Sequence, residues 1–167
     1  MYQIGELVMY GSSGVCEVKA IKEQIFPSTG ERRLYYVLES RYEHCVISAP
    51  VDSDKVFLRP IISKEEAVEL IDSIPGIHAE AFHSRVSREL AEHYERMLKS
   101  HDCASLLALT RSIYLKKQAL LEQKKKFGSV DERFLKRAEN LLFGEFAAAL
   151  GIERDQVPEF IAARIEV

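Results

Sequence analysis

The sequence predicts an α+β protein, in which a small β domain is followed by an all-α domain of four to five helices. Residues 2–60 alternate apolar with polar side chains and are interrupted by glycines, a pattern that is typical of short strands joined by tight turns. After residue 60 the apolar residues recur at helical spacing instead. A chain of 167 residues can form two small domains, and the change of periodicity predicts their bounds as residues 1–60 and 61–167.

The N-terminal pattern predicts a small, strongly bent β-barrel. Strands are expected at residues 6–10, 14–21, 34–39 and 44–48, and a fifth at residues 56–59 is expected to close the sheet. The sequence Gly11-Ser12-Ser13-Gly14 could cradle a phosphate, but it lacks the Lys-Ser/Thr pair and the helix of a phosphate-binding loop. We therefore interpret it as a hairpin turn.

Two capping boxes indicate where helices begin in the C-terminal half. Ser63 and Glu66 form the first box, and Ser129 and Glu132 form the second. Further helices are expected at residues 84–99 and 102–127, and a short one after Pro158. Core-spaced aromatic residues are interpreted as packing residues, and they are Tyr94, Tyr114 and Phe134.

The charge of the chain is unevenly distributed. The formal net charge is −3, yet residues 84–137 carry 13 Lys and Arg against 7 Asp and Glu, which gives +6 there and −9 elsewhere. Charge on a helix is often only a solvated face. Alternatively, a tight turn at Gly128 gathers the basic residues into a patch that neutralises phosphates without reading base sequence. The residues concerned are Lys116, Lys117, Lys124, Lys125, Lys126, Arg133, Lys136 and Arg137.

Catalytic and metal-binding patterns are not found in the sequence. Cys45 stands beside His44, but neighbouring residues of a strand point to opposite faces, so the two cannot act together. The five histidines have no metal-ligand spacing, and the three cysteines build no disulfide framework. We expect a non-enzymatic protein without metal or cofactor. Because the sequence also lacks a membrane-spanning run and a signal peptide, we expect it in the cytoplasm.

Several segments, in order, resemble the CarD family of bacterial transcription regulators. Residues 2–14, YQIGELVMYGSSG, resemble the family's aromatic-x-x-Gly-Asp-x-Val-Val-Tyr-Pro-x-x-Gly start. In the helical half, residues 109–117 resemble its Val-Val-Arg-Asp-Leu-x-Arg-Arg helix, and residues 129–145 resemble its Ser-x-x-Glu-Lys helix that ends in Ile-Leu-x-Gly-Glu. Shorter matches at residues 17–21, 35–38, 50 and 59–60 extend the resemblance over nearly the whole chain.

This resemblance implies a Tudor-like N-terminal domain, shared with transcription-repair coupling factor, that binds the β subunit of RNA polymerase. It also implies a helical domain that contacts promoter DNA, mostly without sequence specificity, and modulates the stability of the open complex. Addition of the strand Cys45–Ala49 to the polymerase is the implied mode of binding. The implied polymerase-binding residues are Lys22, Gln24, Val46, Ile47 and Ser48, and the implied DNA-binding residues are Arg85, Val86, Arg88, Lys116, Lys117, Arg133 and Lys136.

The sequence also departs from the family pattern. Gly11 stands where the family often has Pro, and Gln24 and Ser48 stand where it has basic residues, for which Lys22 and Arg41 are candidate replacements. The family's DNA wedge is a Trp, and this sequence has none. Val86 takes the aligned position, with Phe82 and His83 nearby, and an aliphatic wedge offers little stacking. We expect polymerase binding by a monomer, with weakened or altered DNA contact. The alternative is an adaptor whose helical domain binds a protein and not DNA.

Overall fold

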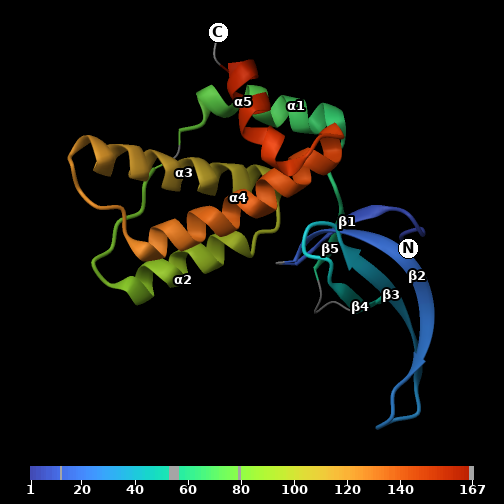
Figure 1. The fold of residues 1–167 in the computed structure, drawn as a ribbon. Coiled ribbons are helices and arrows are strands. Elements are labelled where there is room, and N and C mark those ends of the chain that lie inside the picture. The colour runs from blue at the N-terminus through green and yellow to red at the C-terminus, as the bar shows by residue number, and fades with distance from the viewer. Residues whose placement is uncertain (12, 53–56, 79, 166–167) are drawn as a thin grey trace. The chain divides into compact units, whose positions relative to one another are not determined.

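The computed structural model describes residues 1–11, 13–52, 57–78 and 80–165, and the chain divides into two compact units, Met1–Ile61 and Ile62–Val167. The first unit is an antiparallel sheet, and the second is helical (Figure 1). The predicted α+β class is therefore confirmed. No helix among the described residues is long and apolar enough to cross a membrane.

Five strands form one sheet in the order β4-β3-β2-β1-β5. The predicted closure into a barrel is wrong, because in the part of the chain that the structure describes β4 and β5 remain the two edges. Closure needs extended pairing between the edge strands, but β5 has three residues and ends at Pro60, which has no N–H to donate. Val56, the first residue of the predicted closing strand, lies outside the described residues. The strands are β1 (Leu7–Tyr10), β2 (Gly14–Ile25), β3 (Arg32–Ser40), β4 (Val46–Pro50) and β5 (Leu58–Pro60).

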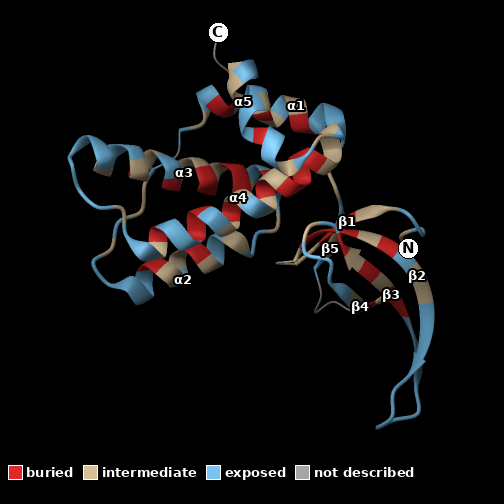
Figure 2. Cartoon of the chain, in the orientation of Figure 1, coloured by how far each residue is buried: buried red, intermediate tan, exposed pale blue. Residues whose placement is uncertain are grey.

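One face of the sheet carries the core of the N-terminal unit, because strand side chains alternate between the two faces. A bulge in β2 between Val18 and Ala20 shifts the register there and bends the strand. The N-terminal segment covers part of the core, since the Tyr2 N–H donates to the Tyr36 hydroxyl at 2.9 Å. At the far end of the β2–β3 hairpin the residues are exposed (Figure 2). The buried core residues are Val8, Cys16, Val18, Tyr36, Leu38 and Ala49.

The glycine-rich segment between β1 and β2 is a hairpin turn, as predicted. The Ser13 N–H donates to the Tyr10 carbonyl at 2.9 Å, and β1 pairs with β2 from Tyr10 opposite Gly14. Gly11 and Gly14 have φ angles of 43° and 81°, a region in which other residues are strained. The turn therefore requires glycine for its backbone and not for a phosphate.

The helices begin and end close to their predicted bounds, with two differences. Helix α2 begins three residues later than predicted, because the Ser84 hydroxyl accepts the Val86 N–H and Val86 becomes the N-cap. Helix α3 ends five residues earlier, just before Lys124 adopts a φ of 56°. The helices are α1 (Lys64–Asp72), α2 (Ser87–Leu98), α3 (Cys103–Glu122), α4 (Ser129–Leu150) and α5 (Val157–Ile165), with short 3-10 turns at η1 (Ile74–Gly76) and η2 (Arg154–Gln156).

Only one of the two predicted capping boxes is present. Ser63 and Glu66 cap α1 reciprocally, with bonds of 3.1 and 3.3 Å. At α4 the N-cap is Gly128, and no side chain caps the helix. Ser129 is already the first helical residue, so the second box is a wrong prediction.

Helix α4 is the centre of the helical unit and contacts α1, α2, α3 and α5 (Figure 1). Tyr94 and Phe134 are buried in this core, as predicted, with ring centroids 5.3 Å apart. Tyr114 is 42% exposed, so the prediction that it packs in the core is wrong. One buried cluster joins α2, α3 and α4 and consists of Leu90, Tyr94, Leu109, Ile113, Phe134 and Leu135.

Candidate functional site

Strand β4 presents an open backbone edge. It pairs with β3 on one side only, from Tyr35 opposite Pro50 to Glu39 opposite Val46. The Ser40 N–H donates to Cys45 and the Val51 N–H donates to Leu34, at 2.8 and 3.0 Å. Because pairs alternate along an antiparallel ladder, the residues that bond to β3 are Cys45, Ile47, Ala49 and Val51. Residues 46, 48 and 50 therefore direct their backbone groups away from the sheet.

An incoming strand would meet two N–H donors and three carbonyl acceptors along this edge. The donors belong to Val46 and Ser48, since Pro50 has no N–H. The opposite edge, β5, is shorter and carries Pro60. Of the two edges, β4 is the better suited to strand addition.

The register places most of the predicted polymerase-binding residues on one face of the sheet. Lys22 lies opposite Tyr35, Gln24 lies opposite Arg33, and Ser48 lies opposite Val37. Directly paired residues share a face, and so do residues two positions apart along one strand. Lys22, Gln24, Arg33, Tyr35, Val46 and Ser48 therefore share one face, which we call the outer face.

Ile47 lies on the opposite face. Its side chain packs against the core of the sheet, and the neighbouring Ala49 is fully buried. Ile47 can therefore support an incoming strand only indirectly, by holding β4 in place. Arg41 lies beyond the end of β3, and its N–H donates to the Val15 carbonyl at 3.0 Å. Of the two candidate basic replacements, Lys22 is on the outer face with Gln24 and Ser48.

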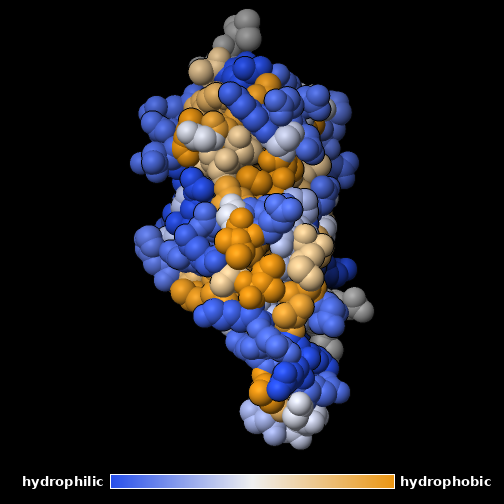
Figure 3. Space-filling view, turned by 90° about the vertical axis from the view of Figure 1, so that its right-hand side faces the viewer, coloured by the Kyte–Doolittle hydropathy of each residue, from blue (hydrophilic) through white to orange (hydrophobic). Residues whose placement is uncertain are grey.

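Apolar side chains stand exposed around the open edge and the tip of the β2–β3 hairpin. Ile25, Phe26, Leu34 and Val46 are 62%, 37%, 45% and 66% exposed. Figure 3 shows hydrophobic atoms at the surface near the hairpin tip, at the bottom of the view. The first three are not among the residues predicted for this interface, although their apolar side chains near the Pro27–Gly30 turn are a signal for them in the sequence.

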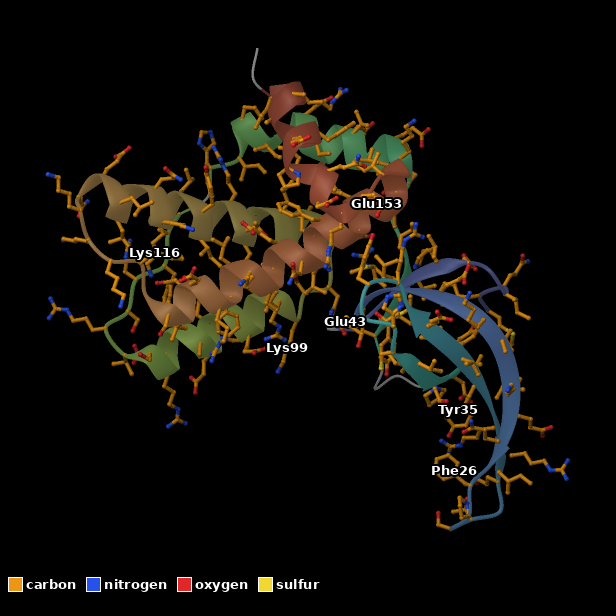
Figure 4. The ribbon with its side chains drawn as sticks, viewed as in Figure 1. Phe26, Tyr35, Glu43, Lys99, Lys116 and Glu153 are labelled. Carbon is orange, nitrogen blue, oxygen red and sulfur yellow. The ribbon has the colours of Figure 1, made fainter. Side chains whose placement is uncertain are left out.

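Phe26 and Tyr35 form an aromatic pair on the outer face, in which Phe26 is exposed and Tyr35 is buried. Their ring centroids lie 6.4 Å apart, and both project from the hairpin arm in Figure 4. The Arg33 guanidinium lies 5.2 Å from the centroid of the Phe26 ring and also pairs with Glu31 at 3.2 Å. A partner that binds β4 would thus meet apolar, aromatic and cationic groups beside the open backbone.

In the helical unit, the start of α2 presents three of the predicted DNA-binding residues together. Arg85, Val86 and Arg88 are consecutive or nearly so, and all are exposed. The Val86 side chain is 51% exposed, and that of Arg88 is 86% exposed although its Nε bonds Glu92 at 3.0 Å. This arrangement places an aliphatic side chain between two exposed cations at the start of a helix.

Phe82 is not available as a replacement wedge. Its ring stacks on His93 with centroids 3.8 Å apart, and it packs against the buried cluster of α2, α3 and α4. The Phe82 carbonyl also accepts a hydrogen bond from Lys116 Nζ at 2.9 Å. Burial lowers the pKa of His93, which favours a neutral imidazole in this stack. Val86 is the remaining candidate, with His83 exposed beside it.

Lys116 is buried, which contradicts its assignment to the DNA-binding surface. Its side chain is 6% exposed, and its Nζ pairs with Asp131 at 3.0 Å. Lys116 is labelled in Figure 4. A charge that is already paired inside the protein cannot neutralise a phosphate. Asp131 lies in the first turn of α4 and faces Lys116 of α3. The spacing of the basic residues along the sequence does not reveal this pairing.

The other predicted basic residues remain at the surface. Arg133 and Lys136 are exposed and lie three positions apart on α4, so they share a face. The Arg133 guanidinium lies 5.0 Å from the centroid of the Phe134 ring. Lys117 is half-buried, with its Nζ 5.6 Å from the centroid of the Phe127 ring. Arg137 is held by Glu95 at 2.6 Å and is therefore less available.

Metal chemistry has no candidate site here. Among the residues that the structure describes, no group of three or more His, Cys, Asp or Glu could hold a metal ion. His44 and Cys45 are both exposed, and Cys16 is buried, where burial above all raises the pKa of its thiol to about 11. A thiol with that pKa is a poor nucleophile near neutral pH.

A bent antiparallel sheet with an open edge strand and exposed apolar residues beside it is suited to protein interaction. Residues 2–62 match the family described as the CarD-like/TRCF RID domain. This is the whole of the N-terminal unit apart from its first residue, so this unit is a CarD-like domain of the kind shared with TRCF, an RNA polymerase-interacting domain. That domain supports an interaction with the β subunit of RNA polymerase. Comparison with the curated proteins gave no match.

Proposed function

We propose that this protein is a non-catalytic transcription regulator that joins RNA polymerase to promoter DNA. The open edge of β4, within a CarD-like RNA polymerase-interacting domain, is the observation that carries the proposal. The N-terminal unit binds the β subunit, and the helical unit contacts DNA and modulates the stability of the open complex. We propose that it acts as a monomer in the cytoplasm and reaches the nucleoid through the polymerase.

Strand addition explains how this edge gives both affinity and register. The outward backbone groups of Val46 and Ser48 extend the sheet with a strand of the β subunit, and side chains of the outer face select the partner. Lys22 and Gln24 lie on that face, two strands from the edge. Ile47 holds β4 against the core. These five residues are the ones that the sequence predicts for the interface. In this proposal Val46 and Ser48 act through their backbone groups, whereas Lys22 and Gln24 act through their side chains.

Substitution of Ser48 by proline tests the edge directly. Ser48→Pro removes an N–H that the sheet itself does not use, so we expect the fold to survive. The lost donor and the ring in the path of the incoming strand should weaken binding to the β subunit roughly tenfold or more. Isothermal titration of the full chain with the β subunit measures this.

A matched variant separates backbone from side-chain effects. Ser48→Thr keeps both the N–H and a hydroxyl, so it should bind like the wild type. Circular dichroism and amide exchange of β2 and β3 should show that the Ser48→Pro sheet is intact. If Ser48→Pro is folded and binds with unchanged affinity, strand addition at β4 is contradicted.

The DNA contact is proposed for the exposed basic residues of α2 and α4. Arg85 and Arg88 flank Val86 at the start of α2, and Arg133 and Lys136 share a face of α4. Such side chains neutralise phosphates and release counterions, without selecting a base sequence. Lys117 is a further member, whereas the burial of Lys116 excludes it. Because Val86 has no ring to stack on a base, the contact should distort DNA less than an aromatic wedge would.

Charge reversal at Arg133 and Lys136 tests this contact. Each lost phosphate contact lowers the slope of log affinity against log salt by roughly 0.9, so Arg133→Glu/Lys136→Glu should reduce it by about 2. The measurement is the affinity of the polymerase-bound protein for a promoter fragment over a series of salt concentrations. The double variant Lys64→Glu/Lys99→Glu changes the net charge equally at exposed residues elsewhere in the same unit.

The alternative function is an adaptor whose helical unit binds a protein and not DNA. It predicts that Arg133→Glu/Lys136→Glu and the control leave the salt dependence of promoter binding equal to that of the wild type. That outcome would exclude the DNA contact while leaving the polymerase contact intact.

A further inference from the structure

The helical unit contains a cavity that neither proposed interface uses. Its volume is about 490 Å³, within the range of roughly 300–1,000 Å³ that is usual for small-molecule sites. It lies among η1, α3, α4 and α5, and most of its lining is aliphatic or aromatic. The residues that form the apolar wall include Ile74, Leu107, Leu142, Phe143, Ile161 and Ile165.

The walls of the cavity are held in a fixed arrangement. Arg164 of α5 makes a bidentate contact with Asp72 of α1, with both bonds at 2.8 Å. Val157, the first residue of α5, is fully buried, and α5 contacts both α1 and α4. The wall that α5 provides therefore does not depend on a ligand, and the cavity is largely pre-formed.

One donor atom in the lining has no hydrogen-bond partner among the residues that the structure describes. The Nε atom of Arg111 is buried and has no hydrogen-bond partner among the described residues. A buried donor without an acceptor costs free energy, and a charged one costs more. The guanidinium carbon lies 6.0 Å from the centroid of the Tyr114 ring. This ring contact does not give Nε a hydrogen-bond acceptor.

The second ionisable group of the lining is Glu139. Burial raises the pKa of its carboxyl, against a smaller opposite effect of Lys117, so it holds a proton more readily than an exposed glutamate. A raised pKa lowers the fraction of Glu139 that is negatively charged at a given pH, so it repels an anion less than an exposed glutamate does. Arg111 is the cationic group of the lining that suits an anion, and the remainder of the cavity suits an apolar group.

We propose that this cavity binds a small amphipathic carboxylic acid, whose carboxylate accepts a hydrogen bond from Arg111 Nε and whose apolar body lies between α3, α4 and α5. The complementary charge satisfies the buried donor, and the apolar body contacts the apolar side chains of the lining. This site is separate from the β4 edge and from the basic residues of α2 and α4, so it goes beyond the proposed function.

Decanoate and decanol form the test pair, because they share an apolar chain and differ in the anionic group. Each is titrated into the full chain below its critical micelle concentration, by calorimetry and by the shift of the unfolding temperature. We expect decanoate to bind and to raise the unfolding temperature, and decanol to bind at least tenfold more weakly. Binding of decanol as tight as that of decanoate, or no binding of decanoate, would overturn the proposal.

Variants locate the site. Arg111→Met keeps the length and apolar stem of the side chain but removes the donor, so decanoate should bind about tenfold more weakly or worse. Ala162→Phe fills the cavity from α5 and should abolish the binding of both probes. Arg96→Met, at an exposed arginine outside the lining, is the control and should bind decanoate like the wild type. Equal decanoate affinity in all three variants would overturn the proposal even where the wild type binds.

Discussion

Lys116, Asp131 and Tyr94 form a buried polar network that joins α2, α3 and α4. Asp131 accepts hydrogen bonds from Lys116 at 3.0 Å and from the Tyr94 hydroxyl at 2.5 Å, and Lys116 also reaches the Phe82 carbonyl. Burial, and then the bond to Asp131, raises the pKa of Tyr94, so its hydroxyl remains a donor. Ions are costly to bury, and this pair is tolerated because several bonds satisfy it.

Removal of one member of the pair should cost more than removal of both. Asp131→Leu leaves the Lys116 ammonium buried without its counter-charge, and we expect a loss of about 3 kcal/mol or more in the free energy of unfolding. Lys116→Met/Asp131→Leu leaves no buried charge and should lose less than Asp131→Leu alone. Urea denaturation of the full chain, followed by helical circular dichroism, measures both. A double variant at least as unstable as Asp131→Leu would contradict this account.

At the scale of elements, the two expected helix caps differ in the structure although they look alike in the sequence. Ser63 accepts the Glu66 N–H, whereas Ser129 lies inside its helix and makes no cap bond. The backbone start of α4 is instead set one residue earlier at Gly128. The difference arises because α4 is positioned by the buried contacts of its first turns, including Asp131, and not by local capping.

A pair of equivalent substitutions tests this difference. Ser63→Ala removes a working N-cap and should lower the free energy of unfolding of the helical unit by about 1 kcal/mol. Ser129→Ala removes no cap bond and should change it by less than about 0.5 kcal/mol, as is usual for exposed positions. Both values come from urea denaturation of the full chain. Equal losses would show that Ser129 caps α4 in solution.

At the scale of the whole molecule, each unit has its own buried core. The sheet buries residues from β1 to β4 together with the N-terminal segment, and the helical unit is built around α4. Within the helical unit, the contact between Asp72 of α1 and Arg164 of α5 joins residues 92 positions apart in the sequence. It ties the first helix of the unit to the last and fixes one wall of the cavity.

This contact should make the helical unit sensitive to acid. The hydrogen bond from Arg164 lowers the pKa of Asp72 below its ordinary value of 3.8. The stabilisation is therefore fully present only well above pH 3.8, declines as the pH falls through that value, and is lost below the lowered pKa. Arg164→Gln should have a lower unfolding temperature than the wild type near neutral pH, and the two curves should converge in acid. Thermal unfolding over a pH series measures this, with Lys136→Gln as a control that keeps the acid dependence of the wild type.

The sequence by itself determined the α+β class, the hairpin turn at Gly11–Gly14, the cap at Ser63 and the burial of Tyr94 and Phe134. These features depend on short-range periodicity, turn chemistry and capping, all of which are determined by residues close together in the sequence. The sequence also indicated the polymerase-interacting domain, because the glycines and aromatic residues that mark this domain lie close together along the chain.

Only the tertiary structure decided which charges and edges are free. Within the residues that the structure describes, it buried Lys116 against Asp131, left Tyr114 exposed, kept the sheet open at β4 and left Arg111 Nε without a hydrogen-bond partner. Spacing along a chain gives the face of one helix or strand, but not what another element brings to that face. Burial and pairing depend on residues far apart in the sequence, and these determine which groups are left to bind a partner.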